Sequence, residues 1–135
     1  GTFGDQPLYQ GLQEYAVIAG TRDSRFNPIT RDELEHLSCG VSLLHSFEPA
    51  ANVTDWEVGV HGIRLFIKGY SATFLPEVAK EQGWSKEETL RHLARKGGYS
   101  GKLTPEVLQE ARLERYQSSK INATWEEYQA YIAEL

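Results

Sequence analysis

The densest cluster of side chains that could do chemistry lies within ten residues in the middle of the chain. It contains two carboxylates, an imidazole and a guanidinium, on Asp55, Glu57, His61 and Arg64. Imidazole titrates near neutral pH, so Glu57 and His61 are the candidate catalytic residues for general acid–base chemistry. They would share one face if residues 57–64 formed a regular strand, but two glycines interrupt that stretch. A loop leading into a hairpin, with a structural hydrogen bond on His61, is the competing interpretation.

Metal binding and nucleotide binding find less support in the sequence. The four histidines are scattered, Cys39 is the single cysteine, and no pair has the spacing of zinc ligands, so we expect no metal site and no cofactor. The glycine-rich stretch 97–101 follows a predicted helix, whereas phosphate loops follow a strand, so we interpret its glycines as a helix end. Cys39 is expected on the inward face of a strand, where a thiol is inert.

A basic-aromatic cluster lies further along the chain. It consists of Arg91, Arg95, Lys96 and Lys102 with Tyr99, and such a set could hold a phosphate backbone beside a stacked base. A solvated helix face explains the same residues. Because 14 basic residues face 19 acidic ones, for a net charge of −5, we favour the solvated face and rank RNA binding last.

Predicted helices should hold some of these candidate residues in place. One amphipathic stripe predicts a first helix that ends near Gly20, with apolar residues at Leu8, Leu12, Tyr15, Ala16 and Ala19. Ser/Thr-x-x-Glu capping boxes predict three further helix starts, at Thr30/Glu33, Ser85/Glu88 and Thr124/Glu127. The first of these helices is short, the second ends at a double glycine, and the third presents one apolar face to the end of the chain.

Alternating patterns predict strands between the helices. They cover residues 39–43, 63–67 and 70–74, and a less regular one begins at Ala111. Lys68-Gly69 is a tight turn that joins the middle two into a hairpin. Pro76 ends the hairpin and begins a short helix. Because helices and hairpins interleave without a βαβ rhythm, we predict an α+β fold.

Length and composition bound the remaining possibilities. The 135 residues suit one compact domain, and the 40% hydrophobic content excludes intrinsic disorder. No run of about eighteen apolar residues exists, so we expect no membrane span. A lone cysteine excludes an internal disulfide, and we expect no signal peptide at the start. The chain contains no methionine, so we expect a processed product or a piece of a longer protein.

Four blocks in the sequence resemble the AMMECR domain family, across nearly the whole chain. They are Asp23-x-Arg25-Phe26-x-Pro28, the stretch from Asp55-Trp56-Glu57 to His61-Gly62-Ile63, the stretch from Phe74-Leu75-Pro76-Glu77 to Trp84, and Arg95-Lys96-Gly97-Gly98. The Asp-Trp-Glu triplet and Glu77 resemble the eukaryotic branch of the family. Only the last residue of the family's Leu-Arg-Gly-Cys-Ile-Gly signature is present, as Gly1, so residues 1–135 are expected to form an N-terminally incomplete AMMECR-like domain that lacks the signature cysteine.

The resemblance implies an α+β domain with a curved, barrel-like mixed or antiparallel sheet and flanking helices. It also implies two subdomains around a cleft that the signature motif lines. The residues we expect at that cleft as binding residues are Gly1, Thr2, Arg25, Asp55, Trp56 and Arg64.

The resemblance implies little about activity, and three hypotheses follow. The favoured one is a non-catalytic regulatory or scaffolding module, nuclear or cytoplasmic, that binds protein partners through the cleft, a Memo-type protein among them. The alternative is an enzyme or enzyme component in a small-molecule or nucleoside modification pathway with Memo-type and radical-SAM partners, using His61 and Glu57. RNA binding through the basic-aromatic cluster ranks third.

Overall fold

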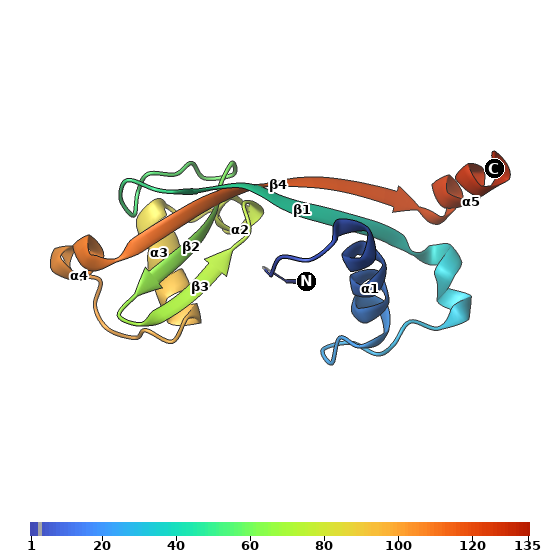
Figure 1. Cartoon of the computed structure of the whole chain (residues 1–135). Helices are drawn as coiled ribbons and strands as arrows, with labels where there is room; N and C mark the ends of the chain where they lie inside the picture. The colour runs from blue at the N-terminus through green and yellow to red at the C-terminus, as the bar shows by residue number, and fades with distance from the viewer. Residues whose placement is uncertain (3) are drawn as a thin grey trace. The chain divides into compact units, whose positions relative to one another are not determined.

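The computed structural model describes residues 1–2 and 4–135, which divide into two compact units. The first unit comprises Gly1–Val41 and Lys120–Leu135, and the second comprises Ser42–Ser119. Figure 1 labels the helices and strands that make up both units. No helix within the described residues is long and apolar enough to cross a membrane.

The strands form an open sheet with the order β1-β4-β2-β3. Their bounds are Ser38–Pro49 for β1, Gly62–Ile67 for β2, Tyr70–Phe74 for β3 and Arg112–Thr124 for β4. Strand β2 pairs antiparallel with β3 on one side and with β4 on the other. The α+β class is confirmed, but the described part of the sheet is open rather than a closed barrel, since β1 and β3 lie at its two edges.

The second unit holds the hydrophobic core. Leu65 of β2 lies between Ala72 of β3 and Leu113 of β4 in the sheet, and these side chains share one face. Helix α3, Lys86–Lys96, contacts β2 and β3, and buries Leu90, Leu93 and Ala94, which are spaced i, i+3 and i+4 as the sequence predicts. Helix α2, Glu77–Gln82, buries Ala79, and α4 is Pro105–Glu110.

The helix boundaries of the second unit follow from local chemistry. Ser85 caps α3 by accepting the Glu88 N–H at 3.1 Å, while the Glu88 carboxylate accepts the Ser85 N–H at 2.9 Å. The helix ends at Lys96 with Gly97 as its C-cap, and Gly98 adopts a φ of 105°, which a residue with a side chain rarely reaches. Both features confirm the predicted boundaries.

The first unit is built from helices and the distal ends of two strands. Helix α1 is Leu8–Thr21, the short 3₁₀ helix η1 is Arg31–His36, and α5 is Trp125–Ala133. The predicted capping residue Thr124 accepts the Glu127 N–H at 3.1 Å at the start of α5. Among the described residues of these three helices, only Gly11 is buried, so the first unit has no hydrophobic core comparable to that of the second.

Candidate functional site

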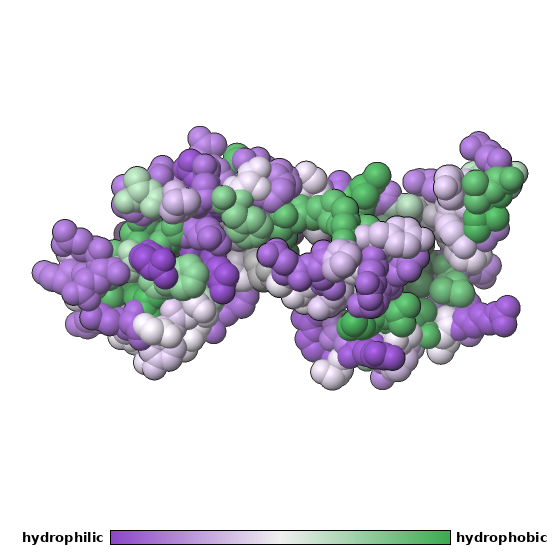
Figure 2. Space-filling model, in the orientation of Figure 1, coloured by the Kyte–Doolittle hydropathy of each residue, from purple (hydrophilic) through white to green (hydrophobic). Residues whose placement is uncertain are grey.

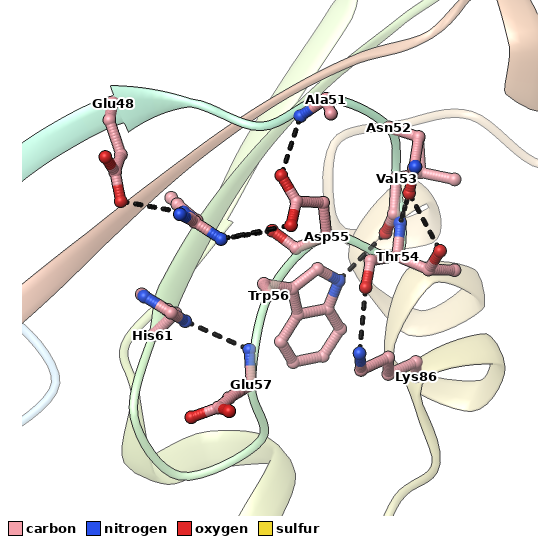
Figure 3. Close-up of polar contacts among 11 residues, drawn as sticks. Glu48, Ala51, Asn52, Val53, Thr54, Asp55, Trp56, Glu57, His61 and Lys86 are labelled. Carbon is pink, nitrogen blue, oxygen red and sulfur yellow. Dashed lines mark hydrogen bonds and ion pairs between the residues drawn. The ribbon is translucent and has the colours of Figure 1, made fainter.

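The loop between β1 and β2 carries half of the candidate site residues, and hydrogen bonds fold it onto itself (Figure 3). The Asn52 side-chain oxygen accepts the Thr54 N–H at 2.9 Å and the Thr54 hydroxyl at 2.8 Å. Asp55 Oδ2 accepts the Ala51 N–H at 2.8 Å. Short polar side chains therefore close successive turns, as Asn and Asp do in turns generally.

Arg115 of β4 fastens this loop to the sheet. Its Nε donates to Glu48 at 2.8 Å, and its Nη1 donates to the Asp55 backbone carbonyl at 3.0 Å and to Asp55 Oδ1 at 3.2 Å. The Ala51 N–H lowers the pKa of Asp55 below 3.8, and the positive charges of Arg115 and Lys86 lower it further against the opposing effect of desolvation. Asp55 is therefore an ionised hydrogen-bond acceptor at neutral pH, a structural role.

Trp56, expected at a cleft, lies in the core beneath the loop with 3% of its surface exposed. Its indole N–H donates to the Val53 carbonyl at 2.8 Å. The Lys86 ammonium lies 5.7 Å from the centre of the indole ring and donates to the Thr54 carbonyl at 2.8 Å. Since the ring is buried and its N–H is bonded, Trp56 holds the loop and α3 together and offers a partner little surface.

The candidate catalytic residues Glu57 and His61 are hydrogen-bonded to each other, but through the backbone of Glu57 and not through its carboxylate. The Glu57 N–H donates to His61 Nδ1 at 3.0 Å, and the Glu57 carbonyl accepts the N–H groups of Val60 and His61 at 3.2 and 3.0 Å. An accepting Nδ1 places the proton of the neutral imidazole on Nε2. Residues 57–61 form a turn rather than a strand, so the structural hydrogen bond of the competing interpretation is present.

Arg64 lies on the sheet face opposite the core. Its guanidinium lies 4.9 Å from the centre of the Phe66 ring, and the guanidinium of Arg112 lies 4.8 Å from the same ring. In the strand register Arg64 lies between Thr73 and Glu114. Contact of two cations with one aromatic ring stabilises this face of the sheet without requiring a ligand.

The other three candidate binding residues belong to the first unit. Arg25 pairs with Asp23 through two bonds, from Nε at 3.0 Å and from Nη2 at 2.7 Å, and this pairing lowers the Asp23 pKa to about 2. Its guanidinium also lies 5.4 Å from the centre of the Phe26 ring. Thr2 accepts the Gly4 N–H at 3.0 Å, and Gly1 is exposed. Phe3, which follows them, lies outside the described residues.

Two other expectations concern Cys39 and metal binding. Cys39 lies on β1 as expected, but it is exposed, so its predicted burial is wrong. Alternation along a strand marks a buried face only where another element covers that face, and little covers this end of β1. Among the described residues no cluster of three or more His, Cys, Asp or Glu side chains could hold a metal ion.

Most of the predicted basic-aromatic cluster lines one pocket in the second unit. Arg91, Arg95, Tyr99 and Lys102 all border a cavity of about 360 Å³ beside α3. Lys96 does not take part, because its ammonium donates to the Thr73 carbonyl at 2.7 Å and lies 5.0 Å from the Phe74 ring centre.

A comparison with protein-family models decides the ancestry of the chain. Residues 1–121 match the AMMECR1 family, a span that includes β1, β2, β3 and most of β4. The chain belongs to the AMMECR1 family. The resemblance inferred from the four sequence blocks is therefore confirmed.

Curated AMMECR1-type relatives occur in plants, fungi and archaea. An uncharacterized protein of Arabidopsis thaliana is 41% identical over 138 residues, covering 98% of this chain and 64% of the relative. An uncharacterized protein of Schizosaccharomyces pombe is 42% identical over 132 residues, covering 95% of this chain and 67% of the relative. The chain thus spans about two thirds of the length of these relatives.

A solved structure shares the AMMECR1 fold. The crystal structure of an uncharacterized protein of Pyrococcus horikoshii superposes with a TM-score of 0.68 at 24% identity, covering 86% of this chain and 59% of the other. At this level of identity the similarity shows the fold alone.

Sequence reasoning missed one feature of this AMMECR1-family chain, an apolar surface on the first unit. Hydrophobic residues reach the surface over α5 and around α1 (Figure 2). A cavity of about 500 Å³ opens between α1 and the segment from η1 to β1, and its lining includes Val17, Ile29, Leu34 and Leu37. The sequence does contain a signal, because Val17 and Ile18 lie off the main apolar stripe of α1.

Proposed function

We propose that the chain is a non-catalytic regulatory module that binds another protein through the apolar surface of its first unit. The observation that carries this proposal is the distribution of buried side chains. Every hydrophobic residue of the described core lies between Val53 and Tyr116, inside the second unit. The first unit has helices of its own but leaves most of their large apolar side chains exposed.

The exposed side chains of the first unit are large. On α1, Leu8, Tyr9 and Val17 are 58%, 78% and 56% exposed, and on α5 Tyr131 is 63% exposed. Large exposed apolar areas mark interaction sites in proteins, and tyrosine is enriched at interfaces. The cavity beside α1 supplies the concave pocket into which a partner's anchor side chain would insert.

Charge indicates what kind of partner fits. The first unit carries four basic and nine acidic residues, whereas the second carries ten of each, so the whole net charge of −5 resides in the first unit. A complementary partner presents an apolar segment flanked by lysine or arginine, because charge of opposite sign accelerates encounter and excludes acidic competitors. The Memo-type protein that the family resemblance suggests is the first candidate to test.

Calorimetric titration of the Memo-type protein into the chain tests this proposal. We expect Val17→Asp to weaken binding at least about tenfold, because it places a charge in the lining of the cavity beside α1. Val60→Asp is the matched control, since Val60 is a similarly exposed valine of the second unit, and it should leave affinity unchanged. Far-UV circular dichroism establishes that both variants are folded.

Two outcomes contradict the proposal. One is equal affinity of the wild-type and Val17→Asp chains for the partner, or equal weakening by both variants. The other is saturation of the same surface by the segments of the Arabidopsis relative that this chain does not match, added in trans. That result would make the surface an internal packing face of the family.

A further inference from the structure

The cavity beside α3 has the composition of a binding site for a small phosphate-bearing molecule. Its floor is apolar, formed by Leu90, Ala94, Leu103 and Leu108. Its rim carries the guanidinium groups of Arg91 and Arg95 and the ammonium of Lys102. The volume of about 360 Å³ falls in the range of pockets that hold small organic ligands.

Among the residues that the structure describes, the three rim cations have no partner, unlike most other cations of the second unit. Arg115, Lys68 and Lys86 are each engaged by a carboxylate or a carbonyl, and Arg64 and Arg112 lie over Phe66. No hydrogen bond or ion pair within the described part of the chain engages the rim side chains Arg91, Arg95 and Lys102. Their donors are therefore available to a ligand.

The charge of the lining matches a phosphate better than a carboxylate. Three cations and the single lining carboxylate of Glu87 give the pocket a net charge of +2. A phosphate monoester carries a charge between about −1.5 and −2 at neutral pH, together with three strong acceptor oxygens. Arg91 and Arg95 are one helical turn apart on α3, so both guanidinium groups can approach one ligand group from the same side.

The wall of the pocket opposite α3 is held in place by its own hydrogen bonds. The Tyr99 N–H donates to the Ala94 carbonyl at 2.9 Å, and the Tyr99 hydroxyl donates to the Lys102 carbonyl at 3.3 Å. Gly101 permits this closure, because a Cβ there would lie 2.5 Å from the Tyr99 hydroxyl oxygen. The loop therefore presents Ser100 and Lys102 from a fixed backbone, which lowers the ordering cost of binding.

We propose that this pocket binds a small organic phosphate, with the phosphate at Arg91, Arg95 and Lys102 and an apolar or aromatic body on the leucine floor. The site lies in the second unit and does not depend on the protein-binding surface proposed above. A single-stranded RNA would need a positive groove that extends over several nucleotides, whereas this pocket is local and the second unit as a whole carries no net charge.

Nuclear magnetic resonance titration of the ¹⁵N-labelled chain tests the proposal with four probes: adenosine monophosphate, inorganic phosphate, adenosine and a ten-nucleotide uridine RNA. We expect adenosine monophosphate to bind most tightly and to shift the amide signals of residues 91–102. Adenosine, which lacks the phosphate, should bind at least about tenfold more weakly. Inorganic phosphate, which lacks the apolar body, should shift the same signals at higher concentration.

Variants separate a built pocket from general charge attraction. Arg91→Gln and Arg95→Gln should each weaken binding of adenosine monophosphate about tenfold, whereas Arg22→Gln, on an exposed arginine of the first unit, should not. Glu87→Gln should tighten binding severalfold, because it removes the acidic group from the lining. An unfolded variant cannot produce that gain.

Three results would overturn the proposal. One is the absence of shifts in residues 91–102 at millimolar adenosine monophosphate. The second is an equal effect of Arg22→Gln and Arg95→Gln, which would indicate unspecific attraction. The third is tighter binding of the RNA with an affinity that falls steeply with salt, which would indicate a strand-binding surface.

Discussion

The indole of Trp56 shows how one side chain can serve a loop and a core together. The ring is buried, and its N–H donates a hydrogen bond to the Val53 carbonyl. Trp56→Ala should lower the free energy of unfolding by about 3–5 kcal/mol, because it leaves a large cavity and an unpaired carbonyl. Urea unfolding measures this loss. Tyr131→Ala, which truncates an exposed aromatic residue, should change stability by less than about 0.5 kcal/mol, and an equally small effect of Trp56→Ala would contradict the buried role.

Because of Asp55, the stability of the fold should depend on pH in the acid range. The Ala51 N–H and the nearby positive charges lower its pKa in the folded chain below the usual 3.8. A carboxylate with a lowered pKa stabilises the fold above its unfolded pKa, and this contribution disappears as the pH falls through the folded value. The melting temperature of the wild type should therefore exceed that of Asp55→Asn at neutral pH, and the difference should shrink below about pH 4. A difference that is constant from neutral to acid pH would show that charge at Asp55 has no part in it.

At the scale of helices and strands, the sequence predicted the features that depend on local chemistry better than those that depend on tertiary context. The capping residues Ser85 and Thr124 and the turn at Lys68-Gly69 lie where the sequence places them, because those signals act within four residues. Helix α4 was missed although Thr104 caps it and Pro105 begins it, a combination typical of helix starts. The burial of Trp56 and the exposure of Cys39 depend on which distant elements cover them, and no local pattern contains that information.

Strand β2 begins at a glycine because an aromatic ring of the neighbouring strand β4 occupies the space that a side chain would need. Gly62 lies opposite Tyr116 in the β2–β4 register, and a Cβ at Gly62 would collide with the Tyr116 ring. The Tyr116 hydroxyl in turn donates to the Phe74 carbonyl at 2.9 Å and bonds to the Thr73 hydroxyl at 2.8 Å, so one ring joins three strands. Burial also raises the Tyr116 pKa above 10, so the phenol stays protonated at neutral pH.

Replacing Gly62 should therefore destabilise the sheet through this ring. Gly62→Ala should cost about 1–3 kcal/mol, and Tyr116→Phe, which removes only the hydroxyl, about 1 kcal/mol. In a double-mutant cycle by urea unfolding, Tyr116→Leu should make Gly62→Ala nearly harmless, because the colliding ring is gone. Additive losses from Gly62→Ala and Tyr116→Leu would contradict the proposed collision.

At the scale of the whole molecule, core and charge are distributed unequally between the two units. The second unit has the buried core and no net charge, while the first has most of the exposed large apolar side chains and the entire negative charge. Isolated helices of this length are marginal in water, since most helical stability comes from packing an apolar face. The helices of the first unit should therefore unfold locally far more readily than the second unit. A partner that covers their apolar side chains should stabilise them.

Native-state hydrogen exchange measures this difference directly in the full chain. Amides of β2 and α3 should exchange only through global unfolding, whereas those of α1 and α5 should exchange faster by about two orders of magnitude or more, which corresponds to at least about 3 kcal/mol of local opening free energy. Leu93→Ala, in the core of the second unit, should accelerate exchange in β2 and α3 and leave α1 and α5 nearly unchanged. A bound protein partner should slow exchange in α1 and α5 selectively, because ligand binding stabilises the elements that it covers. Equal protection of α1 and α3 in the free chain would show that the first unit is stably folded without a partner. That result would contradict the argument for the proposed protein-binding surface.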